Sequence, residues 1–65
     1  MKLKINGEIV EVEATTVQEL AEKLTPAPQT LLIEHNLNAL LRSEWKETAL
    51  SEGDRIEVLR VSAGG

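Results

Sequence analysis

The sequence predicts a small α+β roll, in which one main helix covers one face of a mixed sheet of four to five strands. Two observations carry this prediction. A hairpin pattern is followed directly by an amphipathic helix pattern, and three further short segments have the composition of strands. The 65 residues suffice for one domain only. We expect that domain to span residues 1–61, with a flexible tail at residues 62–65.

The first hairpin is indicated by Asn6-Gly7, which lies between the alternating segments 2–5 and 8–13. Asn-Gly favours a two-residue type I′ turn, because both central residues of that turn need positive φ. A two-residue loop fixes the register, so Ile5 lies opposite Glu8 and Lys2 opposite Glu11. One face of the hairpin then carries Leu3, Ile5, Val10 and Val12, and the other carries Lys2, Lys4 and Glu11.

The main helix is predicted to begin after Thr16, which serves as N-cap, with Glu19 reaching back to the Thr16 N–H in a capping box. Its apolar residues recur at helical spacing: Val17, Leu20, Ala21 and Leu24. Pro26 disfavours helical geometry at Thr25, so the helix should end near Leu24.

The second half of the chain predicts the remaining strands. Residues 30–34 contain three consecutive apolar residues and indicate a buried strand, followed by a turn at His35-Asn36 and a return strand at 37–41. Residues 42–45 indicate a short helical turn in which Trp45 covers one end of the core.

The last strand is predicted over residues 55–61, after a turn at Glu52-Gly53-Asp54. Alternation along this strand assigns Ile56 and Val58 to one face and Leu59 and Val61 to the other.

The residues that most enzymes use are nearly absent. The chain has no cysteine and one histidine, which excludes disulfides, a Cys–His pair and a two-histidine metal site. His35 is expected to be a solvated turn residue, and Ser43 and Ser51 have no evident base–acid partners. We therefore expect no metal and no bound cofactor, and we expect the chain not to be an enzyme by itself.

Charge and hydropathy limit the classes of partner that this chain can bind. Eleven acidic residues against seven basic ones give a net charge of −4, which argues against nucleic acid as the main partner. This charge suits a basic protein surface, although it could equally serve solubility alone. No long apolar run or signal-peptide pattern indicates a membrane or export, so a cytoplasmic location is expected.

The sequence ends in small residues, Ser62-Ala63-Gly64-Gly65. Glycine has no Cβ, so a diglycine end can enter a narrow channel and present an unhindered carboxylate. That carboxylate becomes a good electrophile only when a partner enzyme activates it, for instance with ATP as an acyl-adenylate. A frayed terminus without function is the alternative.

The Asn-Gly hairpin, the Thr-capped helix, residues 42–45, residues 52–55 and the final Gly64-Gly65 together resemble the thiamine-biosynthesis sulfur carriers. These proteins form the ThiS family and have a ubiquitin-like β-grasp fold. The resemblance covers essentially the whole chain. The chain departs from the family pattern at Asn36-Leu37, where an Asn-Gly-type turn is frequent, and at Leu41, where proline is common.

The resemblance implies a specific chemistry for the tail. An E1-like adenylating enzyme would activate the Gly65 carboxylate with ATP and magnesium. A sulfur donor, such as the persulfide of a cysteine desulfurase system, would convert it to a thiocarboxylate. Thiazole synthase would then take the sulfur to build the thiazole ring. Gly64 and Ala63 would be recognised with the tail.

A carrier of this kind must dock on its partners. The sheet face that the helix leaves open is the natural docking surface near the tail. Its candidate residues are Ile9, Leu59, Val61 and the neighbouring Arg60.

Three other functions remain open. The small subunit of molybdopterin synthase shares the fold, the diglycine end and the thiocarboxylate, although the short length and Ser43-Glu44-Trp45 favour the thiamine carrier. The chain could also be a ubiquitin-like modifier that is conjugated to lysines. The third alternative is a plain interaction domain with an inert tail.

Overall fold

The computed structural model describes residues 1–61, and residues 62–65 lie outside the described part. The strands are β1 (Lys2–Ile5), β2 (Glu8–Glu11), β3 (Leu31–His35), β4 (Asn38–Ala39) and β5 (Arg55–Arg60). The helix α1 spans Val17–Leu24, and two 3₁₀ helices, η1 and η2, span Pro28–Thr30 and Arg42–Glu47.

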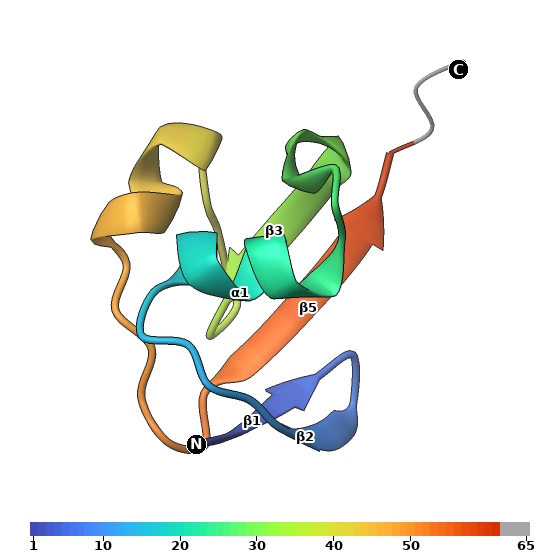
Figure 1. Ribbon diagram of the computed structural model, residues 1–65. Helices are drawn as coiled ribbons and strands as arrows, with labels where there is room; N and C mark the ends of the chain where they lie inside the picture. The colour runs from blue at the N-terminus through green and yellow to red at the C-terminus, as the bar shows by residue number, and fades with distance from the viewer. Residues whose placement is uncertain (62–65) are drawn as a thin grey trace.

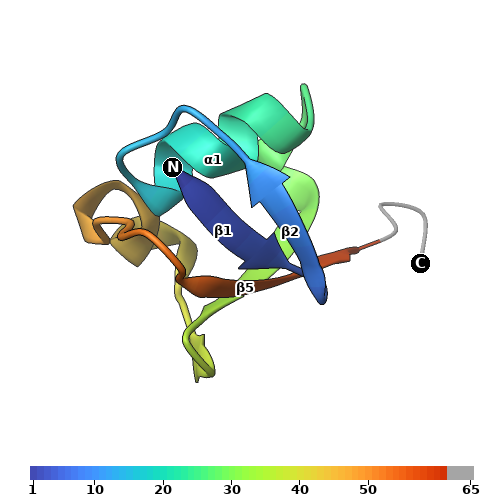
Figure 2. The same ribbon diagram turned by 90° about the horizontal axis from the view of Figure 1, so that it is seen from below.

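All five strands form one sheet in the order β2-β1-β5-β3-β4. β1 and β5 are parallel, whereas the other neighbouring strands are antiparallel, so the sheet is mixed. α1 crosses one face of this sheet, and η2 lies beside α1 (Figure 1). Seen from below, the helix stands above the sheet, and no described helix covers the other face (Figure 2). The predicted α+β roll is confirmed.

The first hairpin has the predicted register: Ile5 pairs with Glu8, and Lys2 pairs with Glu11. Its turn residues Asn6 and Gly7 have φ angles of 50° and 86°, as a type I′ turn requires. Leu3 is fully buried, and Val10 and Val12 pack against the core from the same face. The predicted assignment of faces is therefore confirmed.

α1 begins and ends where the sequence predicts. The Thr16 Oγ1 accepts a hydrogen bond from the Glu19 N–H at 3.2 Å. Glu19 returns to Thr15 rather than to Thr16: its Oε1 accepts from the Thr15 N–H at 2.6 Å and from the Thr15 hydroxyl at 2.8 Å. That choice gives the carboxylate two donors from one residue. Leu24, the last helical residue, is exposed, so only the first three members of the apolar stripe are buried.

Trp45 in η2 covers the core as predicted and is 2% exposed. The Arg42 guanidinium lies 5.9 Å from the centre of its ring and donates to the Gln29 carbonyl of η1 at 2.5 Å. Because Trp45 is the only aromatic residue of the chain, its fluorescence reports on this core directly.

The β3–β4 hairpin corrects three expectations. Its turn residues are Asn36 and Leu37 instead of His35 and Asn36, and β4 has two residues instead of the five predicted. Leu32, expected to be buried, is 57% exposed. The physical reason is that the helix covers one face only, so alternate residues of β3 face away from it.

β5 follows a turn in which Gly53 has a φ of 84°. Ile56 is fully buried and Val58 is half-buried, while Leu59 lies on the exposed side as predicted. β5 ends at Arg60, one residue before the end of the described part.

Candidate functional site

The root of the tail is anchored where the central strand β5 ends, beside η1. The Val61 N–H donates to the Thr30 carbonyl at 2.7 Å, and the Thr30 hydroxyl donates to the Ala27 carbonyl at 2.7 Å. Arg60 pairs with Leu31 in the sheet. The last described residue therefore leaves the domain at a fixed place. Ala63, Gly64 and Gly65, which the sequence analysis assigns to the reacting tail, lie outside the described residues.

The residues expected to dock partners are all exposed but do not form one continuous surface. Leu59 and Val61 share the open face of the sheet, whereas alternation turns Arg60 toward the other side. Ile9 lies opposite Lys4, which lies opposite Arg55. Ile9 is therefore two strands away from β5 and about 13 Å from Leu59 along the strand direction.

The structure adds apolar residues that the sequence analysis missed. Leu32 is the cross-strand partner of Leu59, and both side chains are more than half exposed. The Leu40 N–H donates to the Ile33 carbonyl at 3.0 Å, which continues the β3–β4 register by one residue, and the next residue, Leu41, is 69% exposed. The apolar run of residues 31–33 could have indicated the exposure of Leu32, because alternate residues of a strand face opposite sides of the sheet.

This part of the open face is hollowed. A groove of about 520 Å³ lies over β3, β4 and β5, and Leu32, Leu59 and Ala39 contribute to its lining. Glu34 and Glu57 line it as well, and they are cross-strand partners two residues further from the tail. The groove thus combines an apolar end beside the root of the tail with an acidic end.

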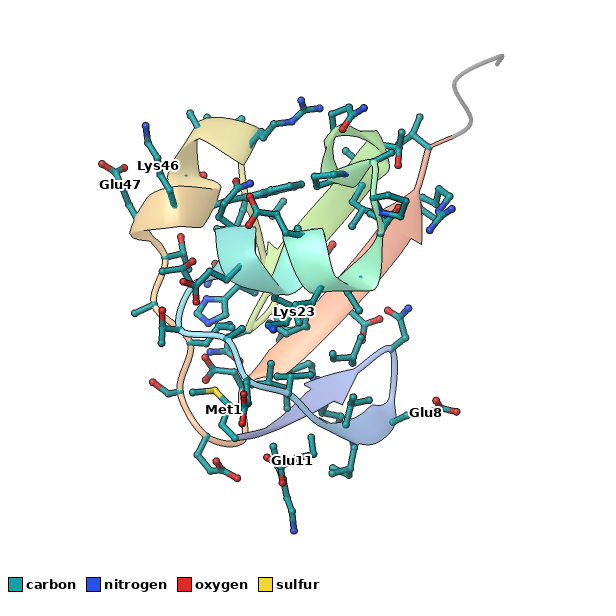
Figure 3. All side chains as sticks on the ribbon, viewed as in Figure 1. Met1, Glu8, Glu11, Lys23, Lys46 and Glu47 are labelled. Atoms are coloured by element: carbon teal, nitrogen blue, oxygen red, sulfur yellow. The ribbon has the colours of Figure 1, made fainter. Side chains whose placement is uncertain are left out.

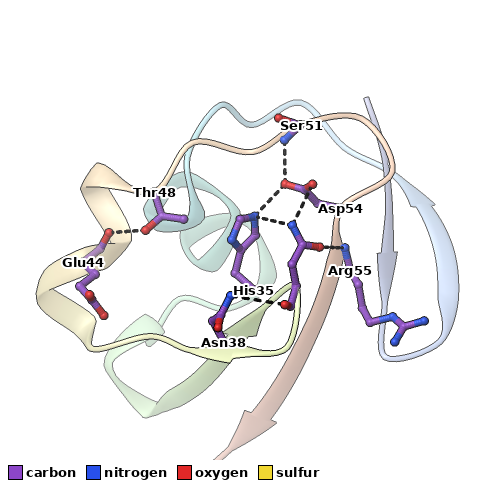
Figure 4. Close-up of polar contacts among 8 residues, drawn as sticks. His35, Asn38, Glu44, Thr48, Ser51, Asp54 and Arg55 are labelled. Carbon is purple, nitrogen blue, oxygen red and sulfur yellow. Dashed lines mark hydrogen bonds and ion pairs between the residues drawn. The ribbon is translucent and has the colours of Figure 1, made fainter.

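A cluster of polar side chains lies at the opposite end of β3 (Figure 4). The His35 Nε2 donates to the Asp54 Oδ2 at 2.7 Å, and the Asn36 Nδ2 donates to the Asp54 Oδ1 at 3.2 Å. The Ser51 N–H also donates to the Asp54 Oδ2 at 2.9 Å. His35 is therefore not the solvated turn residue that the sequence suggested, because its side chain is 19% exposed and paired.

The electrostatics of this cluster indicate a structural role. Burial raises the pKa of Asp54, but hydrogen bonds from His35, the Ser51 N–H and Asn36 outweigh it and hold the pKa below its ordinary value. Ser51 contributes its backbone N–H rather than its hydroxyl, so the arrangement is not that of a nucleophile activated by a base. The cluster instead ties the β3–β4 turn to the start of β5.

Two further observations concern residues 1–61. No group of three or more His, Cys, Asp or Glu side chains in that range is placed to hold a metal ion. None of the helices described there is long and apolar enough to cross a membrane.

Known proteins resemble this chain over its whole length. A crystal structure of a thiamine biosynthesis protein (ThiS) from Geobacter metallireducens superposes with a TM-score of 0.82, is 29% identical, and covers 100% of both chains. That neighbour has the ubiquitin-like β-grasp fold, which is therefore the fold of this chain.

Two curated relatives are thiazole synthases. The relative from Paramagnetospirillum magneticum is 33% identical, and the relative from Magnetococcus marinus is 36% identical. Each matches 100% of this chain, but the chain spans only 20% of the length of each relative. The similarity therefore concerns one domain-sized part of these longer proteins.

The family assignment rests on a match that is almost complete. The model of the ThiS family matches residues 3–65, which include the diglycine end as well as every strand from Leu3 onward. The chain belongs to the ThiS family.

Proposed function

We propose that this protein is a sulfur carrier in thiamine biosynthesis, in which the Gly65 carboxylate is the group that carries the sulfur. The match of the ThiS family to residues 3–65 is the observation that supports this proposal most, because it includes Gly64 and Gly65. The structural neighbour, a thiamine biosynthesis protein of equal extent, supports the same pathway.

In the proposed reaction, an E1-like enzyme transfers AMP from ATP to the Gly65 carboxylate with magnesium and releases pyrophosphate. The terminal sulfur of a persulfide from a cysteine desulfurase system then displaces AMP, which gives an acyl disulfide. A second thiol of the donor system then attacks the donor's cysteine sulfur in that acyl disulfide. A disulfide forms within the donor system, the original S–S bond breaks, and the carrier is released as the thiocarboxylate. Thiazole synthase takes the sulfur from this thiocarboxylate.

The carrier acts as a co-substrate in this scheme, and its partners supply the catalysts. Small sulfur carriers of the ThiS family are generally non-catalytic. Within residues 1–61, the one His–Asp pair holds the β3–β4 turn, and Ser51 contacts Asp54 through its backbone N–H. We place the reaction in the cytoplasm, where ATP is available to the activating enzyme.

The partnership with thiazole synthase is supported by the two thiazole synthases that contain a region similar to this whole chain. Joining a carrier domain to its acceptor raises their effective concentration, which is useful only if the two parts meet during the reaction. Leu59, Val61, Arg60 and Ile9 are the proposed docking residues.

The proposal is tested by reconstituting sulfur transfer with the adenylating enzyme, a cysteine desulfurase, thiazole synthase and this carrier. We expect thiazole formation with the wild type, and none with a chain that lacks Gly65 or carries one extra residue after it. The matched control is Glu47→Gln, which changes an exposed residue of η2 and should retain full activity.

The alternatives give other results. Unchanged sulfur transfer by the chain without Gly65 would contradict the carrier function. Sulfur transfer to the large molybdopterin synthase subunit instead of thiazole synthase would assign the chain to that pathway. Covalent attachment to lysines of other proteins would assign it to the modifiers.

A further inference from the structure

The side chains that line the groove on the open face change from apolar to acidic with increasing distance from the tail. Val61 marks the root of the tail, and the Leu32–Leu59 pair comes next along β5. The Glu34–Glu57 pair follows two residues further on, and all four side chains are exposed. A partner that holds the tail would therefore meet an apolar surface first and an acidic surface second.

The acidic pair is not neutralised within the domain. Cross-strand neighbours lie close enough to interact, and like charges directly opposite each other destabilise a sheet. Arg55 lies two residues before Glu57 on the same face, with Lys4 opposite it. Yet the ion pairs among residues 1–61 are Met1–Glu11 and His35–Asp54, and neither involves Glu34 or Glu57. The two carboxylates thus form a site at which an external cation would relieve repulsion.

We infer that this groove receives thiazole synthase, with an apolar side chain of the enzyme on Leu32 and Leu59 and a Lys or Arg side chain between Glu34 and Glu57. The inference rests on the proposed function and adds the chemistry of the contact. Leu59 lines the groove and lies two residues before Val61, so an enzyme that takes sulfur from the tail would come close to this surface. The net charge of −4 favours a basic partner surface.

The test uses the full chain and purified thiazole synthase, with affinity measured by calorimetry at low and high salt. The variant Glu34→Gln/Glu57→Gln should bind about tenfold more weakly at low salt and lose most of the salt dependence of binding, because the two glutamates no longer form an ion pair with the Lys or Arg side chain of the enzyme. The variant Leu59→Ser should also weaken binding at both salt concentrations, because it removes the apolar contact.

The same acidic variant should make the isolated domain more resistant to urea, since repulsion between the two carboxylates is removed. Trp45 fluorescence measures this unfolding. Weaker binding together with a more stable fold would indicate a partner site. If the two glutamates had a structural role instead, the variant would lose both affinity and stability. The control Glu8→Gln/Glu47→Gln makes the same change in net charge at exposed residues of β2 and η2 that do not line the groove (Figure 3). It should change affinity by less than about twofold.

Two results would overturn the inference. One is that the acidic variant binds thiazole synthase with the same affinity and the same salt dependence as the wild type. The other is a loss of binding that is confined to the adenylating enzyme. Thiocarboxylate formation by the wild type is scored separately: if it fails, the proposed function fails, whatever the groove binds.

Discussion

The side chain of Asn6 forms two hydrogen bonds with the backbone of Val58. The Asn6 Oδ1 accepts from the Val58 N–H at 2.8 Å, and the Asn6 Nδ2 donates to the Val58 carbonyl at 3.2 Å. The carboxamide thereby continues the β1–β5 ladder past the pair Ile5–Ile56. It joins the tip of the first hairpin to the strand that leads to the tail. Asn6 thus serves as a turn residue and as a clamp on β5.

Replacing Asn6 by alanine should cost about 2 kcal/mol of unfolding free energy, because both hydrogen bonds are lost and alanine is disfavoured at positive φ. Asn6→Gly separates the two causes: it loses the hydrogen bonds but tolerates the φ of 50°, so about 1 kcal/mol should be lost. Urea unfolding followed by Trp45 fluorescence measures both. Equal stabilities of the wild type and Asn6→Ala would show that the clamp contributes nothing.

Leu37 has a φ of 73° and is 70% exposed, an unfavourable conformation for a bulky side chain that makes little packing contact. Leu37→Gly should therefore raise the unfolding free energy by about 1 kcal/mol, since glycine adopts positive φ without strain. Leu37→Ala keeps the strain and is the matched control, so it should give no gain. The expectation fails if the alanine variant is stabilised as much as the glycine variant.

The lowered pKa of Asp54 predicts a loss of stability in acid. A carboxylate whose pKa falls on folding stabilises the native state above its unfolded pKa of about 3.9. That contribution is lost as the pH falls through this value toward the lower native one. The wild type should therefore lose stability below about pH 4 more steeply than Asp54→Asn. Urea midpoints measured across this range test the difference.

Two other carboxylates, those of Glu11 and Glu19, also contribute to the loss of stability at low pH. Hydrogen bonds from the N-terminal ammonium lower the pKa of Glu11, and those from Thr15 lower the pKa of Glu19. Some acid sensitivity should thus remain in Asp54→Asn. Glu47→Gln, which removes an exposed acid, should follow the wild-type curve. If Asp54→Asn also follows the wild-type curve, the His35–Asp54 cluster does not depend on the charge of Asp54.

The elements that local rules specify were predictable from the sequence. Asn6-Gly7 fixed the register of the first hairpin, because its turn type leaves only one pairing. Thr16 and Pro26 set the limits of α1 through capping and through the restriction on the residue before proline. Membership of the ThiS family was predictable from the resemblance over the whole chain, and the family match confirms it.

Features that depend on contacts between distant segments were not predictable in this way. His35 is held by Asp54, which is 19 residues further along the chain, and no local pattern indicates that pairing. Leu32 was assigned to the core because an apolar run does not reveal which sheet face lacks a helix. The facing pair Glu34 and Glu57 appears only when the β3–β5 register is known.

A bulky residue near the end of the tail should stop activation without affecting the fold. Gly64→Leu adds a side chain where a narrow channel of the partner would accept only glycine. We expect adenylation of this variant to fall by at least about a hundredfold, as expected when the reacting group is misplaced. Its urea unfolding should match that of the wild type. Pyrophosphate release measures the first effect, and reduced stability would show instead that residue 64 supports the fold.

The most direct test of the carrier function is the mass of the intact protein after incubation with its adenylating enzyme, ATP, magnesium and a persulfide donor. We predict a mass increase equal to the exchange of one oxygen for one sulfur, located in the peptide that ends at Gly65. Omission of ATP should abolish it. An unchanged mass, with an adenylating enzyme shown to be active, would contradict the account.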